Sequence, residues 1–539
     1  MSESEVPQDS QQSVPQESQE AVPQMTKEEL EILMLNCPVH HPLVVFDPEQ
    51  YERDLSAGLI ELARANPGVA NKAPYKPSDI QAAHKAVNIP PGTGKKRVNI
   101  TITIAYSWPH DYVQSCLDAI CRVYDIPSRQ IEMIYLNADG NKCTSNEESV
   151  LLNNINTNVI TPLKNYISGM SSTSTTPIAN IANYNDANSG VATEYQDQLG
   201  WLGELLLDLW AFAMNPNANI RVVCAFNTSM SNMLKGVAYA SADANFFDNP
   251  NGTTDVVNMS WGGPAGIDYT YLDGTTFNNP RICYVGGTGD QRYSTYPSTS
   301  PNVLSVGGTS LYYDSTATDA VKKGPYNSVW SAGSGAGFAI GYARPEYQNN
   351  LAALTTYNPA MRCTPDVCSI ADSITGVLIF FTDGSPNATA KIAKQQLGGV
   401  SLASPILCGL LSHLVQKAYN ENQVPITTIV NSPNSIPLQH FLYSNYASNP
   451  AMFYDVVDGT IAVPTMNALG TQNSGMSFSA ATGYDIASGL GVPFIQGILN
   501  VMFPSQPPII NQPGGATIAG SDNATATAVK VIFNINKQQ

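Results

Sequence analysis

The sequence predicts an α/β fold in which helices cover both faces of a doubly wound, mostly parallel sheet. Two observations carry this prediction. Short apolar runs rich in β-branched residues, the pattern of buried strands, alternate with longer helical stretches between residues 98 and 419. The 539-residue chain is also 43% hydrophobic and only 13% charged, so it can bury a large core.

Six apolar runs are expected to form buried strands, and three long stretches are expected to form helices. The strands are Val98–Tyr106, Ile220–Phe226, Asp255–Met259, Arg281–Val285, Val303–Val306 and Gly376–Phe381. The helices are His110–Tyr124, Trp201–Met214 and Ser401–Tyr419. Because helices separate the strands, the connections favour parallel over antiparallel pairing.

The composition divides the chain into four segments. Residues 1–26 repeat Val-Pro-Gln in a Ser-, Glu- and Gln-rich context typical of a disordered tail. Residues 27–72 predict a short helical N-terminal extension, and residues 73–503 one large α/β domain. Residues 504–539 start with a Pro/Gly-rich linker and continue as a C-terminal tail.

Charge and hydropathy exclude several classes of partner. The net charge of -17 argues against nucleic acid, since phosphate backbones require clustered Lys and Arg. No apolar run is long enough to predict a membrane span, and no secretory signal is visible, so the compartment stays open. Nine widely spaced cysteines favour a buried, reduced set over a disulfide framework. The oligomeric state is not predicted.

Glu204 and Asp208 are the first candidate functional residues. They are four residues apart in WLGELLLDLWAFAM and therefore share one face of a helix that is apolar almost all round. Such a helix is buried, and no Lys or Arg lies within a turn to neutralise the pair. Two close carboxyls in poor solvent share a proton, which makes one of them a serviceable base. The alternative is a polar stripe on a surface helix.

Ser401 and Asp290 are the second and third candidates. Ser401 follows Gly398-Gly399 and opens a helix, where free N–H groups suit an oxyanion; the alternative is a simple N-cap. Asp290 lies on a loop at the carboxyl end of a predicted strand, where catalytic groups of open α/β sheets collect; the alternative is a turn aspartate.

Together these motifs resemble the sedolisin family of serine-carboxyl peptidases, which have a subtilisin-like fold. GGVSLASP around Ser401 resembles the family's GTSxxxP signature, and Glu204 with Asp208 matches its ExxxD pair. VVNMSWGGP, SPNVLSVGGTSL, TPDVCSIADSITG and TGYDIASGLGVP also match, in the family's order. The resemblance extends over roughly residues 73–502 and implies protein or peptide substrates.

The resemblance implies a role for each candidate. Ser401 would be the nucleophile, Glu204 its general base, and Asp208 the group that orients Glu204 and shares its proton. Asp290 would be protonated and would donate a hydrogen bond to the oxyanion, which an ionised aspartate cannot do. Such a site implies acid-pH cleavage by an acyl-enzyme mechanism, and the family is usually secreted or lysosomal.

The resemblance also implies one calcium ion near the C-terminus. Its ligands would be the carboxylates of Asp455 and Asp485 and the carbonyl oxygens of Val456, Ala481 and Gly483. Oxygen ligands from two loops suit calcium. The alternative is a pair of ordinary polar loops.

The match departs from the family pattern at several positions. Val400 replaces a typical Thr, and Gln-Arg follows Asp290 where a small residue and Gly are expected. An acid near the start of the first helix, often linked to the catalytic network, has only Asp111 as a candidate, with Tyr112 possible in its place, and the N-terminal extension is shorter than the usual prosegment. The sequence therefore predicts a serine-carboxyl endopeptidase. A catalytically silent scaffold or particle component and a tripeptidyl exopeptidase stay open as alternatives.

Overall fold

The computed structural model describes most of the predicted domain. The described residues are 32, 35–40, 44–45, 69–87, 89, 97–170, 178–180, 191–242, 253–265, 269–349, 351, 360–386, 389–420, 437–464 and 473–503. The predicted tail 1–26, most of the predicted extension 27–72 and the C-terminal segment 504–539 lie outside them. The division into four segments therefore stays a prediction.

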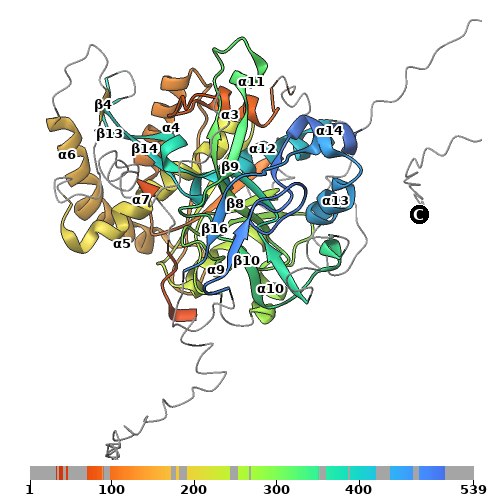
Figure 1. Cartoon of the computed structure of the whole chain (residues 1–539). Helices are drawn as coiled ribbons and strands as arrows, with labels where there is room; N and C mark the ends of the chain where they lie inside the picture. The colour runs from red at the N-terminus through yellow and green to blue at the C-terminus, as the bar shows by residue number, and fades with distance from the viewer. Residues whose placement is uncertain are drawn as a thin grey trace, which may run out of the picture.

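A sheet of eight strands forms the centre of the molecule, as Figure 1 shows. Seven strands pair in parallel in the order β12-β8-β7-β6-β2-β5-β3, and β9 pairs antiparallel with β8. Their bounds are β2 Asn99–Ala105, β3 Glu132–Tyr135, β5 Asn219–Ala225, β6 Val256–Met259, β7 Cys283–Gly287, β8 Leu304–Tyr312, β9 Tyr326–Val329 and β12 Val367–Ile370. The predicted doubly wound, mostly parallel α/β architecture is confirmed.

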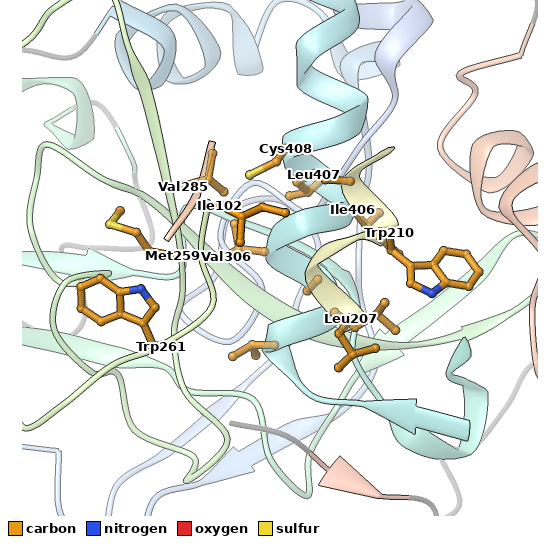
Figure 2. Packing of buried hydrophobic residues seen from close by; sticks show 14 of the residues in the cluster. Ile102, Leu207, Trp210, Met259, Trp261, Val285, Val306, Ile406, Leu407 and Cys408 are labelled. Carbon is orange, nitrogen blue, oxygen red and sulfur yellow. The ribbon is translucent and has the colours of Figure 1, made fainter. Parts of the chain in front are cut away.

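Helices α7 Gln196–Asp208, α9 Met230–Ala242 and α12 Val400–Asn420 pack on this sheet and supply much of the core. Helix α4 His110–Tyr124 packs on β13 Val377–Thr382 of a second sheet, and the short helix α8 Trp210–Met214 packs on α12. Helix α12 packs on β6, β7 and β12 and also on α7 and α8. Figure 2 shows Leu407 and Cys408 of α12 among Ile102, Val285 and other buried side chains of the sheet. The beginning of α12 is thereby fixed between the sheet and α7.

A second, four-stranded sheet lies beside the first. It contains β13 Val377–Thr382, β14 Ile392–Gly398, β1 Val44–Val45 and β4 Ile178–Asn180. Strand β14 pairs antiparallel with β13 and β1 and parallel with β4. The run predicted at Gly376–Phe381 thus forms a strand, but in this sheet and antiparallel to its neighbour.

The predicted helix Trp201–Met214 is longer and is broken. Helix α7 begins at Gln196, five residues earlier, and ends at Asp208; α8 starts at Trp210. Leu209 forms the junction, and the helix stays buried on all sides through it. The break directly follows Asp208, so Glu204 and Asp208 remain on one face of one helix.

The remaining elements surround these layers. The helices are α3 Pro77–Ala83, α5 Ser145–Ile155, α6 Thr161–Gly169, α10 Thr270–Thr276, α11 Ala320–Lys323, α13 Pro437–Tyr446 and α14 Ile495–Met502, with a π-helical turn at Asn156–Ile160 and 3₁₀ turns at Thr193–Tyr195, Glu346–Gln348, Ser373–Thr375 and Pro450–Met452. Short strands pair as β10 Gly337–Ala343 with β11 Met361–Thr364, β15 Phe453–Tyr454 with β18 Val492–Pro493, and β16 Thr460–Ala462 with β17 Ser477–Ser479. None of the described helices is both long and apolar enough to cross a membrane. All nine cysteines are described and free, and eight of them are buried.

Candidate active site

Ser401 lies in the first turn of α12, directly after the second sheet. Strand β14 ends at Gly398, and Gly399 reverses the chain with φ +104°, a conformation that a side chain would strain. The helix then starts at Val400, so the N-cap role considered for Ser401 does not apply. Ser401 is fully buried, and its hydroxyl donates to the carbonyl oxygen of Ser260 at 3.3 Å.

Glu204 and Asp208 reach the same place from α7, and both are fully buried. Neither oxygen of Glu204, nor Oδ2 of Asp208, has a hydrogen bond partner within the described chain. Burial raises the pKa of Glu204 well above its usual range, and the neighbouring charge of Asp208 raises it further, while the Ser401 hydroxyl lowers it. Burial likewise raises the pKa of Asp208. The surface-stripe interpretation of this pair is therefore wrong.

Asp290 joins the site from the loop after β7. Its Oδ1 accepts a hydrogen bond from the Val400 amide at 2.8 Å, next to Ser401. Its Oδ2 is buried and has no hydrogen bond partner among the described residues. Burial raises the pKa of Asp290 well above its usual range, although the Val400 N–H lowers it. The sequence-predicted residues Ser401, Glu204, Asp208 and Asp290 thus come together.

Two further residues complete the polar cluster. Asn258 Nδ2 and Ser260 Oγ donate to Asp208 Oδ1 at 2.7 and 2.6 Å, and both side chains are fully buried. The sequence analysis quoted both within VVNMSWGGP but assigned neither a role. Their positions in the sequence could have indicated a role, because both lie at the carboxyl end of a predicted buried strand. Polar residues there line the edge of a parallel sheet at which catalytic groups collect.

Asp111 does not belong to this network. Its side chain is fully exposed and interacts with His110 at the start of α4. Tyr112 is buried, but its hydroxyl has no hydrogen bond partner among the described residues. His413, on the nucleophile's own helix, interacts with the Met214 carbonyl oxygen at 3.0 Å, so it is a packed side chain and not a catalytic base.

The residues of the implied calcium site lie close together, but their arrangement does not fit the ion. Asp485 Oδ1 accepts from the amides of Ala487 and Ser488, and Oδ2 accepts from the Ala481 amide and the Ser488 hydroxyl. A carboxylate offers about four lone-pair positions, and protein donors fill all four here. The Asp455 carboxylate likewise accepts a hydrogen bond from an amide, that of Gly483, at 3.0 Å. This arrangement does not support calcium binding at Asp455, Val456, Ala481, Gly483 and Asp485, which stays an untested prediction, and no step below depends on it.

Two described stretches of the N-terminal segment, residues 35–40 and 44–45, pair with backbone near the site. His40 exchanges two backbone hydrogen bonds with Gly262, two residues after Ser260, and Val39 donates to Thr228. Val44 pairs antiparallel with Gly398, three residues before the nucleophile. Backbone at Gly262 and at Gly398, near Ser401 in the sequence or through Ser260, thus pairs with the N-terminal segment.

Comparison with known proteins places these features in context. The family model described as "Subtilase family" matches residues 175–445, half of the chain. Sedolisin of Pseudomonas sp. (strain 101) is 28% identical over 293 residues, which span 51% of this chain and 42% of the relative. Kumamolisin of Bacillus sp. (strain MN-32) is 25% identical over 328 residues, which span 56% of this chain and 51% of the relative.

One solved structure is described as "Pseudomonas sedolisin (serine-carboxyl proteinase) complexed with two molecules of pseudo-iodotyrostatin". It has a TM-score of 0.49 and 19% sequence identity, and covers 79% of this chain and 97% of that one. The chain spans about half the length of the curated relatives named above.

Proposed function

This chain belongs to the subtilase family, within which its relatives are sedolisins, and from that premise we propose that it is a serine-carboxyl endopeptidase active at acid pH. The observation that carries the proposal is the meeting of two fully buried carboxyls, a partly buried third and one buried serine. Unpaired carboxyls in a core cost free energy, so their retention is typical of a functional site. Substrates would be proteins or peptides.

Ser401 would attack the substrate carbonyl carbon, and Glu204 would accept its proton. In this structure the hydroxyl donates to Ser260, and a rotation about its Cα–Cβ bond would redirect it to the unoccupied oxygens of Glu204. Glu204 would then pass the proton to the departing amine, which leaves an acyl-enzyme for water to hydrolyse. Asp208 would share the proton of Glu204, because two close buried carboxyls cannot both ionise readily.

Asp290 would stabilise the oxyanion. With Oδ1 fixed by the Val400 amide, the free Oδ2 is the atom that carries the proton and donates it to the substrate oxygen. Cleavage would fail at high pH, when Asp290 ionises, and at very low pH, when the Glu204–Asp208 pair is fully protonated. A bell-shaped profile on the acid side follows.

The path of the N-terminal segment supports endopeptidase over tripeptidyl exopeptidase action. Chain pairs with Gly262, two residues after Ser260, with Gly398, three residues before Ser401, and also with Thr228. Backbone edges that bind chain at several points suit an internal bond. Removal of tripeptides instead requires a closed end that recognises a free N-terminus.

The proposed roles are tested by substitution. Glu204→Gln should lower kcat by at least about 1,000-fold without unfolding the protein, because the amide cannot accept a proton. Glu147→Gln is the matched control, since Glu147 is a partly exposed acid at the start of α5. A Glu204→Gln protein that cleaves like the control would contradict the assignment of the base.

A further inference from the structure

Asn258 is the point at which the nucleophile helix, the central sheet and the carboxyl pair meet. It lies fully buried on β6. Its Nδ2 donates to Asp208 Oδ1 of α7 at 2.7 Å, and its Oδ1 accepts from the Ser404 hydroxyl of α12 at 2.7 Å. A single amide therefore connects one turn of the nucleophile helix to one carboxylate of the pair.

These contacts determine the orientation of the Asn258 side-chain amide, that is, which position its oxygen and its nitrogen occupy. The Ser404 hydroxyl and the Cys408 thiol, at 3.4 Å, both donate to its oxygen, while its nitrogen faces a carboxylate and the Ser260 hydroxyl. The reverse orientation would place the amide oxygen against the Asp208 oxygen in a dry site, which is unfavourable. The nitrogen is thus kept as a donor to Asp208.

As a result, the two carboxylate oxygens of Asp208 differ in the hydrogen bonds that they accept. Oδ1 accepts from Asn258 and from Ser260, whereas the buried Oδ2 has no hydrogen bond partner in the described chain. The shared proton then has Oδ2 of Asp208 and the oxygens of Glu204 as its available positions. Hydrogen bonds to the ionised form favour ionisation.

We propose that Asn258 is a positioning residue of the catalytic pair: it directs the proton to the free oxygen of Asp208 and allows the pair to carry its negative charge at acid pH. The proposal rests on the peptidase function proposed above. The Ser260 hydroxyl acts with it on the same oxygen. The charged and titratable groups that act on the pair are Asp290 from the loop after β7 and Cys408 of α12, and burial raises the pKa of that thiol, which stays neutral.

The first test is the pH dependence of kcat/KM for a peptide substrate. Asn258→Ala should move the acid limb to higher pH by about one unit and lower the maximal kcat about 10- to 100-fold, because the pair then ionises less readily. Ser260→Ala should move the limb in the same direction. Asn215→Ala is the matched control: Asn215 is buried and donates to Ser412 of α12 at 2.7 Å, but within the described residues its side chain makes no hydrogen bond to Glu204 or Asp208. An Asn258→Ala limb that stays with the control would overturn the proposal.

The second test needs no activity and so separates this inference from the proposed function. Urea unfolding of the full-length chain is measured from pH 3 to pH 8. The stability that Asn258→Ala loses should grow as the pH rises, since the amide stabilises the ionised pair, whereas the loss in Asn215→Ala should be constant. An equal loss in Asn258→Ala at every pH would show a purely structural role. If the wild-type chain cleaves nothing, the peptidase proposal fails, and this measurement still decides the role of Asn258.

Discussion

In the proposed mechanism Asp290 accepts one hydrogen bond and donates another, and substitutions at this position test whether its ionisation sets the pH dependence. Asparagine can keep both, with its oxygen accepting from the Val400 amide and its nitrogen donating to the oxyanion. Asp290→Asn should therefore retain part of the activity and lose the fall in rate at higher pH, because an amide does not ionise. Asp290→Ala should lower kcat by about 100- to 1,000-fold. An Asp290→Asn profile that still falls with rising pH would contradict the assigned role.

At the scale of elements, the N-terminal segment occupies backbone edges that a substrate would use. Pairing of His40 with Gly262 and of Val44 with Gly398 sets an intramolecular competitor beside Ser401. Removal of residues 1–45 should lower KM for a peptide about 10-fold, since a tethered competitor acts at high effective concentration. Removal of residues 1–26 alone leaves the pairing residues in place and should leave KM unchanged. Equal KM values for both truncations would exclude competition.

The hydrogen bonds within the loop Ala481–Ser488 lead to a prediction about stability. Asp485→Ala should lower the free energy of unfolding by at least about 2 kcal/mol, because three backbone amides and the Ser488 hydroxyl lose their acceptor. With all positions on Asp485 filled, a chelator should not change the melting temperature of the wild type. A melting temperature that falls on chelation and recovers with Ca²⁺ would show that the loop opens to bind the ion.

The sequence predicts the positions of helices and strands more accurately than it predicts which of these elements contact one another. Helix α4 was predicted residue for residue, because its apolar face is unambiguous and Pro109 precedes it. Strand β13 was found but assigned to the wrong sheet, because its apolar run is the same for parallel and antiparallel pairing. Asp208 was predicted, whereas Asn258 was not given a role, since only the packing of α7 on β6 shows which strand residue faces the carboxyl. The periodicity of apolar residues indicates which side chains are buried, whereas contacts between segments distant in the sequence are seen only in the folded structure.

At the scale of the whole molecule, buried carboxyls should make the fold more stable in acid. Burial raises the pKa of Glu204, Asp208, Asp290 and Asp372, and those of Asp273 and Asp485 to about 6. Each group binds its proton more tightly folded than unfolded, so its contribution is full below about pH 4 and is lost as the pH rises through the folded pKa. Burial lowers the pKa of His84 to about 4 and lowers that of His413, which opposes this trend between about pH 4 and 6.5.

Six carboxyls outweigh two histidines in this balance. The free energy of unfolding from urea titrations should therefore fall by on the order of 1 kcal/mol per pH unit between about pH 5 and pH 7. Glu204→Gln should make that slope shallower, because one of the titrating groups is gone. A stability that rises from pH 5 to pH 7 would mean that the carboxyls are not protonated in the folded protein.

The central claim is that Ser401, activated by carboxyls, cleaves peptide bonds in acid. Its most direct test is digestion of a denatured protein by the purified full-length chain from about pH 3 to pH 7, with Ser401→Ala alongside. We predict cleavage that is confined to the acid range and absent from Ser401→Ala. Cleavage that persists in Ser401→Ala would contradict the assigned nucleophile. A folded wild-type chain, tested full-length and without residues 1–45, that cleaves at no pH would instead indicate a catalytically silent scaffold.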